Sequence, residues 1–382
     1  MFSSSPAIEA PRVSGENGVV QPAAAVAHQR TRAAFTLTEC PRTGESAAVV
    51  FARLADELAA RGAELLGLMI YGNVNAHEEI GRAMRAALGE TRWPVTWSEG
   101  ASCDGAPLAG VQAFAIRRGQ VTRVRLAGAV VGSIYEEAGA RFCLLGGLGP
   151  TALTLAPAAQ VQQTFGNLEE ALALAGFELG DVVRTWFYNA DILAWYREFN
   201  RVRSALYAGV KWRTGSLPAS TGIGARNPAG AALTLGALAM RPSEANANVS
   251  AHEIGSPLQC PAPAYGSAFS RAMELRTRDT RRLLVSGTAS IRPGGETACV
   301  GDAGRQVELT LDVIGAILKS CDMDFADVTR ATAYYRFARD RAHFEAWLVA
   351  RELALPVVHT RSVICRDDLL FELELDAVRR FY

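Results

Sequence analysis

The chain has 382 residues, which is enough for two or three domains. Lys plus Arg and Asp plus Glu both number 39, so the formal net charge is zero and no bulk field attracts nucleic acid or an anionic membrane. Any anionic ligand must therefore be held by local side chains, and nearly all of the positive charge is arginine, whose planar fork suits carboxylates.

The cysteine and histidine patterns favour a reduced, metal-free protein. The seven cysteines are scattered and never form a CxxC pair, and the five histidines show no metal-ligand spacing. A phosphate-binding loop and a GxSxG nucleophile elbow are also absent from the sequence. We expect a cytoplasmic protein without metal or cofactor that acts on a small molecule and contacts neither nucleic acid nor membrane.

The first 32 residues are rich in Ser, Ala, Pro and Gly and predict a disordered tail without a signal peptide or membrane anchor. A first, degenerate α+β unit is expected over residues 33–118. Its first helix carries an apolar stripe, a strand follows at Leu65–Tyr71, and a second amphipathic helix precedes closing strands that begin at Trp93. The stripe of the first helix consists of Ala47, Val50, Leu54 and Leu58.

A second unit is expected over residues 119–240. It opens with a β-ribbon, Val124–Ile134 followed by Arg141–Gly146. A helix, a strand at Val182–Tyr188 and a second helix come next, and Leu217-Pro218 ends the second helix and starts the closing strands. The stripe of its first helix consists of Val161, Phe165, Leu168 and Leu172.

Residues 241–260 are interpreted as a linker, and residues 261–382 repeat the second unit. Gln306-Val307 repeats Gln160-Val161, and Tyr334 repeats Tyr188, at the same spacing. The equivalent helical stripe is Val307, Leu311, Ile314 and Leu318. The order β-β-α-β-α-β-β predicts an α+β unit with two helices on one face of a mixed sheet. Three such sheets can bury their open faces against each other as an intramolecular pseudo-trimer, in a monomer or small homo-oligomer.

The closing strand of the third unit alternates apolar and acidic residues from Leu370 onward. Glu372, Glu374 and Asp376 therefore share one face, which by pattern alone is the wet side of a sheet. Aligning the repeats places Thr234 and Gly110 at the position of Glu372. A carboxylate present in one copy of three favours a function for Glu372, whereas Glu374 and Asp376 keep the solvent-facing interpretation.

The third unit resembles the RidA (YjgF, chorismate mutase-like) fold, whose homotrimers hold active sites between neighbouring subunits. Pro356, Arg361 and Glu372-Leu373-Glu374 match its signature. The whole chain more specifically resembles the chorismatases, which link such units into one polypeptide. This resemblance rests on four stretches: Leu217–Gly224, Ala264–Ala272, Val285–Ile291 and the segment from Cys365-Arg366 to Glu372.

The resemblance implies a hydrolase or lyase of secondary metabolism that cleaves chorismate to pyruvate and a ring product. Glu372 stands where the family keeps its catalytic acid, which would protonate the enolpyruvyl ether. Cys365 stands at the position that separates subtypes, and cysteine there favours 3-hydroxybenzoate over a dihydroxycyclohexadiene carboxylate. In that branch the ring hydroxyl attacks internally and the ring then aromatises. A buried core thiol, matched by Cys103 in the first unit, is an equally good interpretation.

Chorismate carries two carboxylates, so two clamps are expected. The resemblance assigns one to Arg361, and Arg271 is a candidate for the second. Further candidate binding residues are Tyr265, Ser267, Tyr335 and Arg226. Two other functions stay open: an imine or enamine deaminase like the smaller RidA relatives, and a carboxylate-binding module without catalysis.

Overall fold

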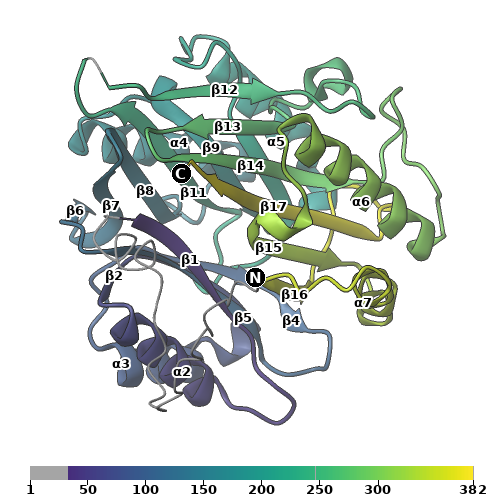
Figure 1. Ribbon diagram of the computed structural model, residues 1–382, viewed down its shortest axis with the longest axis horizontal. Helices are drawn as coiled ribbons and strands as arrows, with labels where there is room; N and C mark the ends of the chain where they lie inside the picture. Colours follow the sequence, from purple (N-terminus) through teal and green to yellow (C-terminus); the bar gives the residue numbers. More distant parts are fainter. Residues whose placement is uncertain (1–32, 246, 382) are drawn as a thin grey trace, which may run out of the picture. The chain divides into compact units, whose positions relative to one another are not determined.

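The computed structural model describes residues 33–381 except residue 246, so the predicted tail lies outside the described residues. Three β-sheets follow one another along the chain, and each carries two α-helices on one face (Figure 1). Because strands and helices are segregated to opposite layers of every unit, the α+β fold of three tandem units is confirmed.

The first sheet has four strands in the order β1-β5-β2-β3. β2 and β3 are parallel, whereas β5 is antiparallel to both β1 and β2. The bounds are β1 (Ala33–Glu39), α2 (Ala47–Ala60), β2 (Ala63–Gly72), α3 (His77–Leu88), β3 (Val95–Glu99), β4 (Ala101–Ser102) and β5 (Leu108–Arg117).

The second sheet has six strands in the order β10-β9-β11-β8-β7-β6. The predicted single strand Val124–Ile134 is wrong, because Ala127 and Gly128 have φ values of 48° and 85° and turn the chain between β6 and β7. The bounds are β6 (Thr122–Leu126), β7 (Ala129–Glu137), β8 (Ala140–Leu148), α4 (Pro157–Leu174), β9 (Val182–Asn189), α5 (Ile192–Tyr207), β10 (Ala219–Gly224) and β11 (Leu233–Pro242).

The third sheet has seven strands in the order β12-β13-β14-β17-β15-β16-β4. The predicted linker is not free chain throughout, because Ser250–Ile254 forms β12 and pairs with β13. β4 of the first unit closes the other edge by pairing with β16. The bounds are β12 (Ser250–Ile254), β13 (Ala272–Arg276), β14 (Thr280–Ala289), α6 (Ala303–Ser320), β15 (Val328–Tyr335), α7 (Arg341–Ala350), β16 (Val357–Arg361) and β17 (Phe371–Arg380).

Short 3₁₀-helices occupy several of the connections between these elements. They are η1 (Val74–Ala76), η2 (Leu179–Asp181), η3 (Ala262–Tyr265), η4 (Phe325–Asp327) and η5 (Ala338–Asp340). Every residue of the three predicted helical stripes is buried, and each stripe packs on its own sheet. In the described part of the chain, no helix combines the length and the apolar character needed to cross a membrane.

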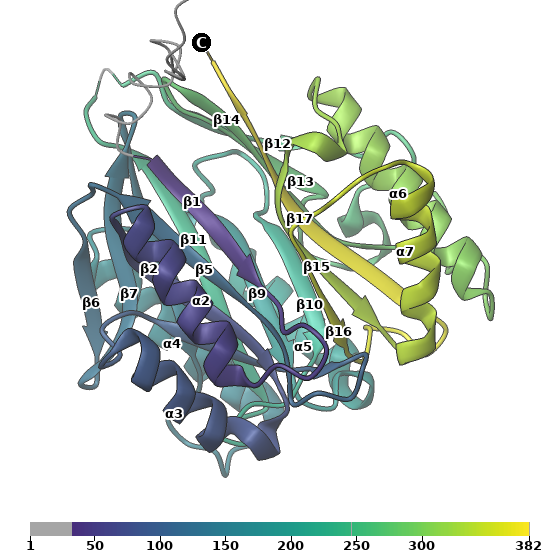
Figure 2. The ribbon, with the colours of Figure 1, turned by 60° about the horizontal axis from the view of Figure 1, so that its bottom comes forward.

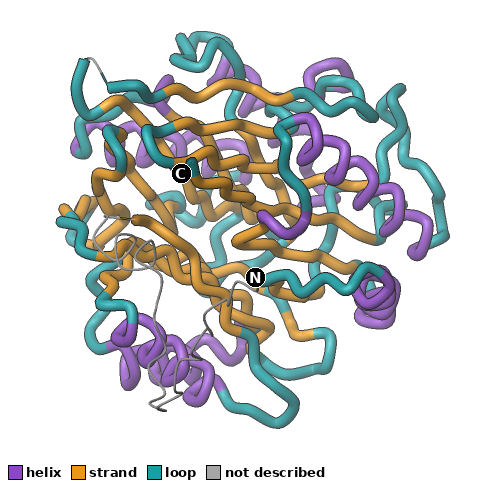
Figure 3. Tube along the Cα trace, in the orientation of Figure 1, coloured by secondary structure: helices purple, strands orange, loops and turns teal. Residues whose placement is uncertain are grey.

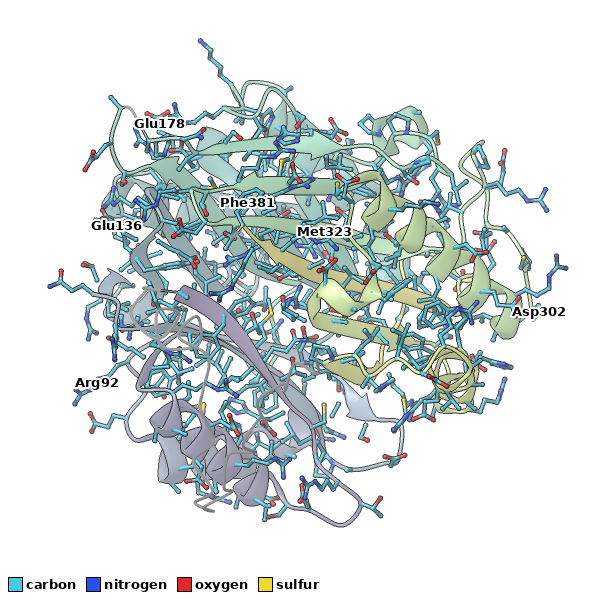
Figure 4. All side chains as sticks on the ribbon, viewed as in Figure 1. Arg92, Glu136, Glu178, Asp302, Met323 and Phe381 are labelled. Carbon is cyan, nitrogen blue, oxygen red and sulfur yellow. The ribbon has the colours of Figure 1, made fainter. Side chains whose placement is uncertain are left out.

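The sheets turn their other faces toward one another, with the helices outside (Figures 2 and 3). Tyr71, Tyr188 and Tyr334 occupy the same register position in the three units, opposite Gly110, Thr234 and Glu372 respectively. All three tyrosines are buried in one cluster, and side chains from all three sheets extend into the space between them (Figure 4). The repeat alignment therefore holds residue by residue around a pseudo-threefold axis.

Candidate active site

A buried recess lies between the second and third units. It has a volume of about 50 Å³ and opens beside a surface hollow of about 430 Å³. Tyr196, Tyr265, Ser267 and Arg366 line both spaces, so they separate the recess from the hollow. A ligand too large for the recess alone has to span the two.

Glu372 projects from β17 into this recess and is only 4% exposed. The facing strand β14 has an irregular register between Val285 and Thr288. Gly287 lies in that irregularity, and a Cβ built there would overlap Oε1 of Glu372. The Gly287 amide donates to the Thr221 hydroxyl of the second unit over 3.0 Å. The irregular strand and the absent side chain together make room for the acid.

Burial raises the pKa of Glu372 to about 8, and the nearby negative charge of Glu374 adds to this effect. The guanidinium of Arg184 acts in the opposite direction on the same pKa but does not cancel it. The Glu372 carboxyl is therefore mostly protonated at neutral pH, which is the state that a general acid requires.

Glu374 lies two residues further along β17, is fully buried and is the centre of a hydrogen-bond network. Burial tends to raise the pKa of Glu374, but two guanidiniums and a hydroxyl outweigh burial and hold it below its ordinary value. Its donors are Arg184 (2.5 Å), Thr221 (2.5 Å), Trp186 (3.1 Å), Arg330 (3.0 Å) and Tyr334 (3.4 Å). An ionised carboxylate is thus held beside a protonated one.

The solvent-facing interpretation of Glu374 and Asp376 is wrong. Both residues are buried, because this face of β17 turns toward the other two sheets and not toward water. Asp376 accepts a hydrogen bond from Nε of Arg330 over 3.0 Å. Arg330 also donates from Nη1 to Glu374 and to Gln112 of the first unit, so it ties two units together.

Cys365 lines the recess next to Glu372. Burial raises the pKa of the Cys365 thiol to about 12, and the neighbouring Glu372 charge raises it further. Arg366 and the hydroxyl of Tyr196 act in the opposite direction on this pKa. Cys365 is therefore a neutral thiol, which excludes it as a thiolate nucleophile at neutral pH.

Arg271, Tyr265 and Ser267 also line the recess, so five of the eight predicted site residues come together there. Arg271 is 3% exposed and donates from both Nε and Nη2 to the carbonyl of Cys260, which fixes its orientation. Its guanidinium lies 5.3 Å from the centre of the Tyr265 ring. These contacts hold a buried cation in the wall of the recess.

Two further arginines of the recess were not among the predicted site residues. Arg203 comes from α5 of the second unit, is 2% exposed, and its Nε has no partner among the described residues. Arg366 donates to the carbonyl of Gly295 over 2.7 Å. The signal for Arg203 was its position directly after Val202 and four residues after Phe199, on the apolar stripe of a helix.

Three predicted residues lie outside the recess. Arg361 is exposed at the end of β16 and pairs with Ala101 of the first unit, so it belongs to a different interface. Arg226 is exposed and forms an ion pair with Glu99 at 2.5 Å. Tyr335 faces the helices, because its neighbour Tyr334 faces the axis and side chains alternate along a strand.

Metal-ligating side chains do not gather in this site. Over residues 33–381 as described, no group of three or more His, Cys, Asp or Glu residues is arranged to hold a metal ion. The charged groups of the recess are instead one acid and three guanidiniums, which fit an organic anion.

Comparison with known proteins finds a matching family model and two named relatives. Residues 146–233 match the family model described as Endoribonuclease L-PSP. Two relatives named chorismatase, from Streptomyces rapamycinicus and Streptomyces hygroscopicus, are 32% and 31% identical over 217 and 239 residues. The chain is similar in sequence to these two chorismatases over about half of its own length.

The similarity to these chorismatases is partial in sequence and broad in structure. The alignments cover 50% and 55% of this chain and 63% and 64% of the relatives, so the chain spans less than two thirds of either chorismatase. A solved chorismatase structure superimposes on 91% of this chain and on 99% of its own length, with a TM-score of 0.62 and 21% identity. This superposition shows a shared fold.

Proposed function

We propose that the protein cleaves the enolpyruvyl ether of chorismate to pyruvate and 3-hydroxybenzoate, with Glu372 as the general acid. The observation that carries this proposal is the pKa of about 8 of a carboxyl group buried between two units. A carboxylic acid that stays protonated at neutral pH is needed to protonate an electron-rich carbon–carbon double bond.

Glu372 donates its proton to the methylene carbon of the enolpyruvyl group. The resulting cation is an oxocarbenium ion, and its formation leaves Glu372 as a carboxylate that stabilises the positive charge. The ring hydroxyl then attacks the neighbouring ring carbon as the bond between that carbon and the bridging ether oxygen breaks. The three-carbon fragment leaves as pyruvate with the bridging oxygen as its carbonyl, and the hydroxyl proton returns to Glu372 before the ring aromatises. Glu374, held ionised by Arg184 and Arg330, keeps Glu372 in its acidic form before each turnover.

The substrate's two carboxylates are bound by the arginines of the recess. Arg203, Arg271 and Arg366 converge on it from three different segments, which provides more than one cationic clamp. Arg271 is already fixed by the Cys260 carbonyl, so little side-chain entropy is lost when a ligand binds. Arg361 and Arg226 have no place in this proposal, because each lies at another interface.

The choice of product depends on water. Pyruvate and 3-hydroxybenzoate together contain the atoms of chorismate, whereas formation of a dihydroxycyclohexadiene carboxylate also consumes water. The neutral thiol of Cys365 is a weak hydrogen-bond partner and offers little support to an attacking water molecule. The small volume of the recess further favours internal attack by the ring hydroxyl.

The proposal is tested by incubating the protein with chorismate. Pyruvate should be released, measured with lactate dehydrogenase, and chromatography should identify 3-hydroxybenzoate as the ring product. Glu372→Gln should lower kcat by at least 100-fold, while the exposed control Glu308→Gln keeps full activity. Absence of pyruvate would rule out chorismate cleavage, and full turnover by Glu372→Gln would rule out Glu372 as the acid.

A further inference from the structure

A second, larger cavity lies on the pseudo-threefold axis and shares no lining residue with the recess. Its volume of about 630 Å³ is in the range of small-molecule binding sites. All three units contribute to it, with Phe114 from the first, Trp186 from the second and Asp376 from the third. A ligand of this cavity can therefore differ from the substrate proposed for the recess at Glu372.

The walls of this axial cavity differ in polarity between the units. Phe114, Leu238 and Asp376 are equivalent by register, since each lies four residues beyond Gly110, Thr234 and Glu372 respectively. Position 376 is thus apolar in two copies and acidic in the third. Arg282 comes from the same sheet as Asp376, so one wall is polar and two are apolar.

The polar wall contains hydrogen-bonding groups without partners. Asp376 is 6% exposed, and only its Oδ2 is bonded, to Nε of Arg330. Among the described residues, Oδ1 of Asp376 and Nη2 of Arg330 have no hydrogen-bond partner. Leaving a buried carboxylate oxygen without a donor is unfavourable, because the group has lost its water and gained no partner. A ligand that supplies a positively charged donor at Asp376 would recover that cost.

Arg282 supplies the opposite charge. Arg282 lines the cavity and forms one long ion pair with Glu137, at 3.4 Å. Burial tends to lower the pKa of Arg282, but the negative charges of Glu137 and Asp376 outweigh burial and raise it. On the neighbouring strand β14, Leu284 lies directly opposite Asp376. Arg282 precedes Leu284 by two residues, so Arg282 and Asp376 point to the same face of the sheet. A negative and a positive group thus stand near each other on the polar wall, which also includes Asp327, Arg379 and Arg380, and they face aromatic and aliphatic side chains of the other two units.

We propose that the axial cavity binds a zwitterionic α-amino acid with a bulky apolar side chain. The ammonium group pairs with Asp376 and the carboxylate with Arg282. The side chain lies against Phe114, Trp186 and Leu144. A molecule with only one of the two charges would leave either Oδ1 of Asp376 without a donor or Arg282 with only its long contact to Glu137, so both charges contribute to recognition.

The test uses calorimetric titration of the full-length protein with L-phenylalanine, 3-phenylpropionate and 2-phenylethylamine. The two analogues keep the ring but lack the ammonium and the carboxylate respectively. L-phenylalanine should bind at one site per chain, and each analogue should bind at least tenfold more weakly. Equal affinity for all three, or no binding of L-phenylalanine, would overturn the proposal, and this comparison needs no variant.

Variants locate the site. Asp376→Leu and Arg282→Phe introduce the residues that stand at the equivalent positions in the second unit, Leu238 and Phe142, and each should weaken L-phenylalanine binding at least tenfold. Glu372→Gln should leave it unchanged. Binding that persists in both cavity variants, or that is lost in Glu372→Gln, would place the amino acid elsewhere. Since no chorismate is used, a negative result here is independent of the proposed reaction.

Discussion

Glu372 and Glu374 stand two residues apart on the same face of β17, yet their carboxyl pKa values are shifted in opposite directions. Glu374 is bonded by five donors, including two arginines, and is held ionised. Burial and the Glu374 charge hold Glu372 protonated. Two identical side chains on one strand thereby differ in charge, with Glu372 protonated and Glu374 ionised.

The pH profile should report Glu372 directly. The acid is active when protonated, so kcat/KM should be constant below pH 8 and fall about tenfold per pH unit above its pKa of about 8. A glutamate with the ordinary pKa of 4.5 would place this decline more than three pH units lower. Steady-state rates measured between pH 5 and 10 decide between the two.

Changing the neighbours of Glu372 should move this decline in opposite directions. Glu374→Gln removes the negative charge that raises the pKa of Glu372, so activity should be lost at a lower pH than in the wild type. Arg184→Met removes the positive charge that lowers the same pKa, so the decline should move to a higher pH. Simple destabilisation would not shift the two profiles in opposite senses, and parallel shifts would contradict this electrostatic role.

Arg203 should contribute mainly to substrate binding. Arg203→Met removes a buried cation from the recess, and loss of a charge-assisted hydrogen bond typically weakens binding by about 10- to 100-fold. The effect should appear in KM more than in kcat. Arg82→Met, an exposed position on α3, is the matched control and should behave as wild type. An unchanged KM in Arg203→Met would remove Arg203 from the binding site.

Gly287→Ala should abolish the proposed activity without unfolding the protein. The new Cβ would occupy the position of Oε1 of Glu372, so the acid must leave its place facing the recess. We expect a loss of about 100-fold or more in kcat. Gly166→Ala on α4 meets nothing within 4 Å and serves as the control. Circular dichroism would verify the fold of both, and near-normal activity of Gly287→Ala would show that the carboxyl tolerates displacement.

The acid should also destabilise the fold as the pH rises. Folding raises the pKa of Glu372 from its ordinary 4.5 to about 8, so the stabilising contribution present below pH 4.5 is lost as the pH rises toward 8. Glu372→Gln should therefore be more stable than wild type at pH 8, by up to about 5 kcal/mol. Urea unfolding at pH 5 and pH 8 should show this difference growing with pH, and a difference that does not grow would argue against the raised pKa.

The repeat made most of the fold predictable from the sequence. Apolar stripes at helical spacing, strands bounded by Pro and the equivalence of Tyr188 with Tyr334 all appear in the structure as predicted. The alignment also singled out Glu372 before any geometry was known. Local pattern was sufficient here because each unit forms its own helix–sheet core.

The wrong predictions concern contacts between units, because the sequence of one strand does not show which of its faces packs against a neighbouring unit. Glu374 alternates with apolar residues as a solvent-facing residue would, and only contact between sheets reveals that its partners are Arg184 and Arg330. Arg361 lies outside the recess for a related reason, since the chain pairs with the first unit at Arg361 and with the second unit two residues later, at Val363. The sequence did contain a signal for the Glu374 network: Arg184 and Arg330 stand at equivalent positions in two almost fully buried strands, β9 and β15.

The three facing sheets belong to one polypeptide, and this has a consequence for assembly. A ring made of separate chains obeys mass action and falls apart on dilution, taking with it any site built from two subunits. Here Thr221 and Glu372 come from different units of the same chain. Their association is intramolecular, so it depends on the connecting segments and not on the protein concentration. Specific activity should therefore stay constant at dilutions that would empty a three-chain ring.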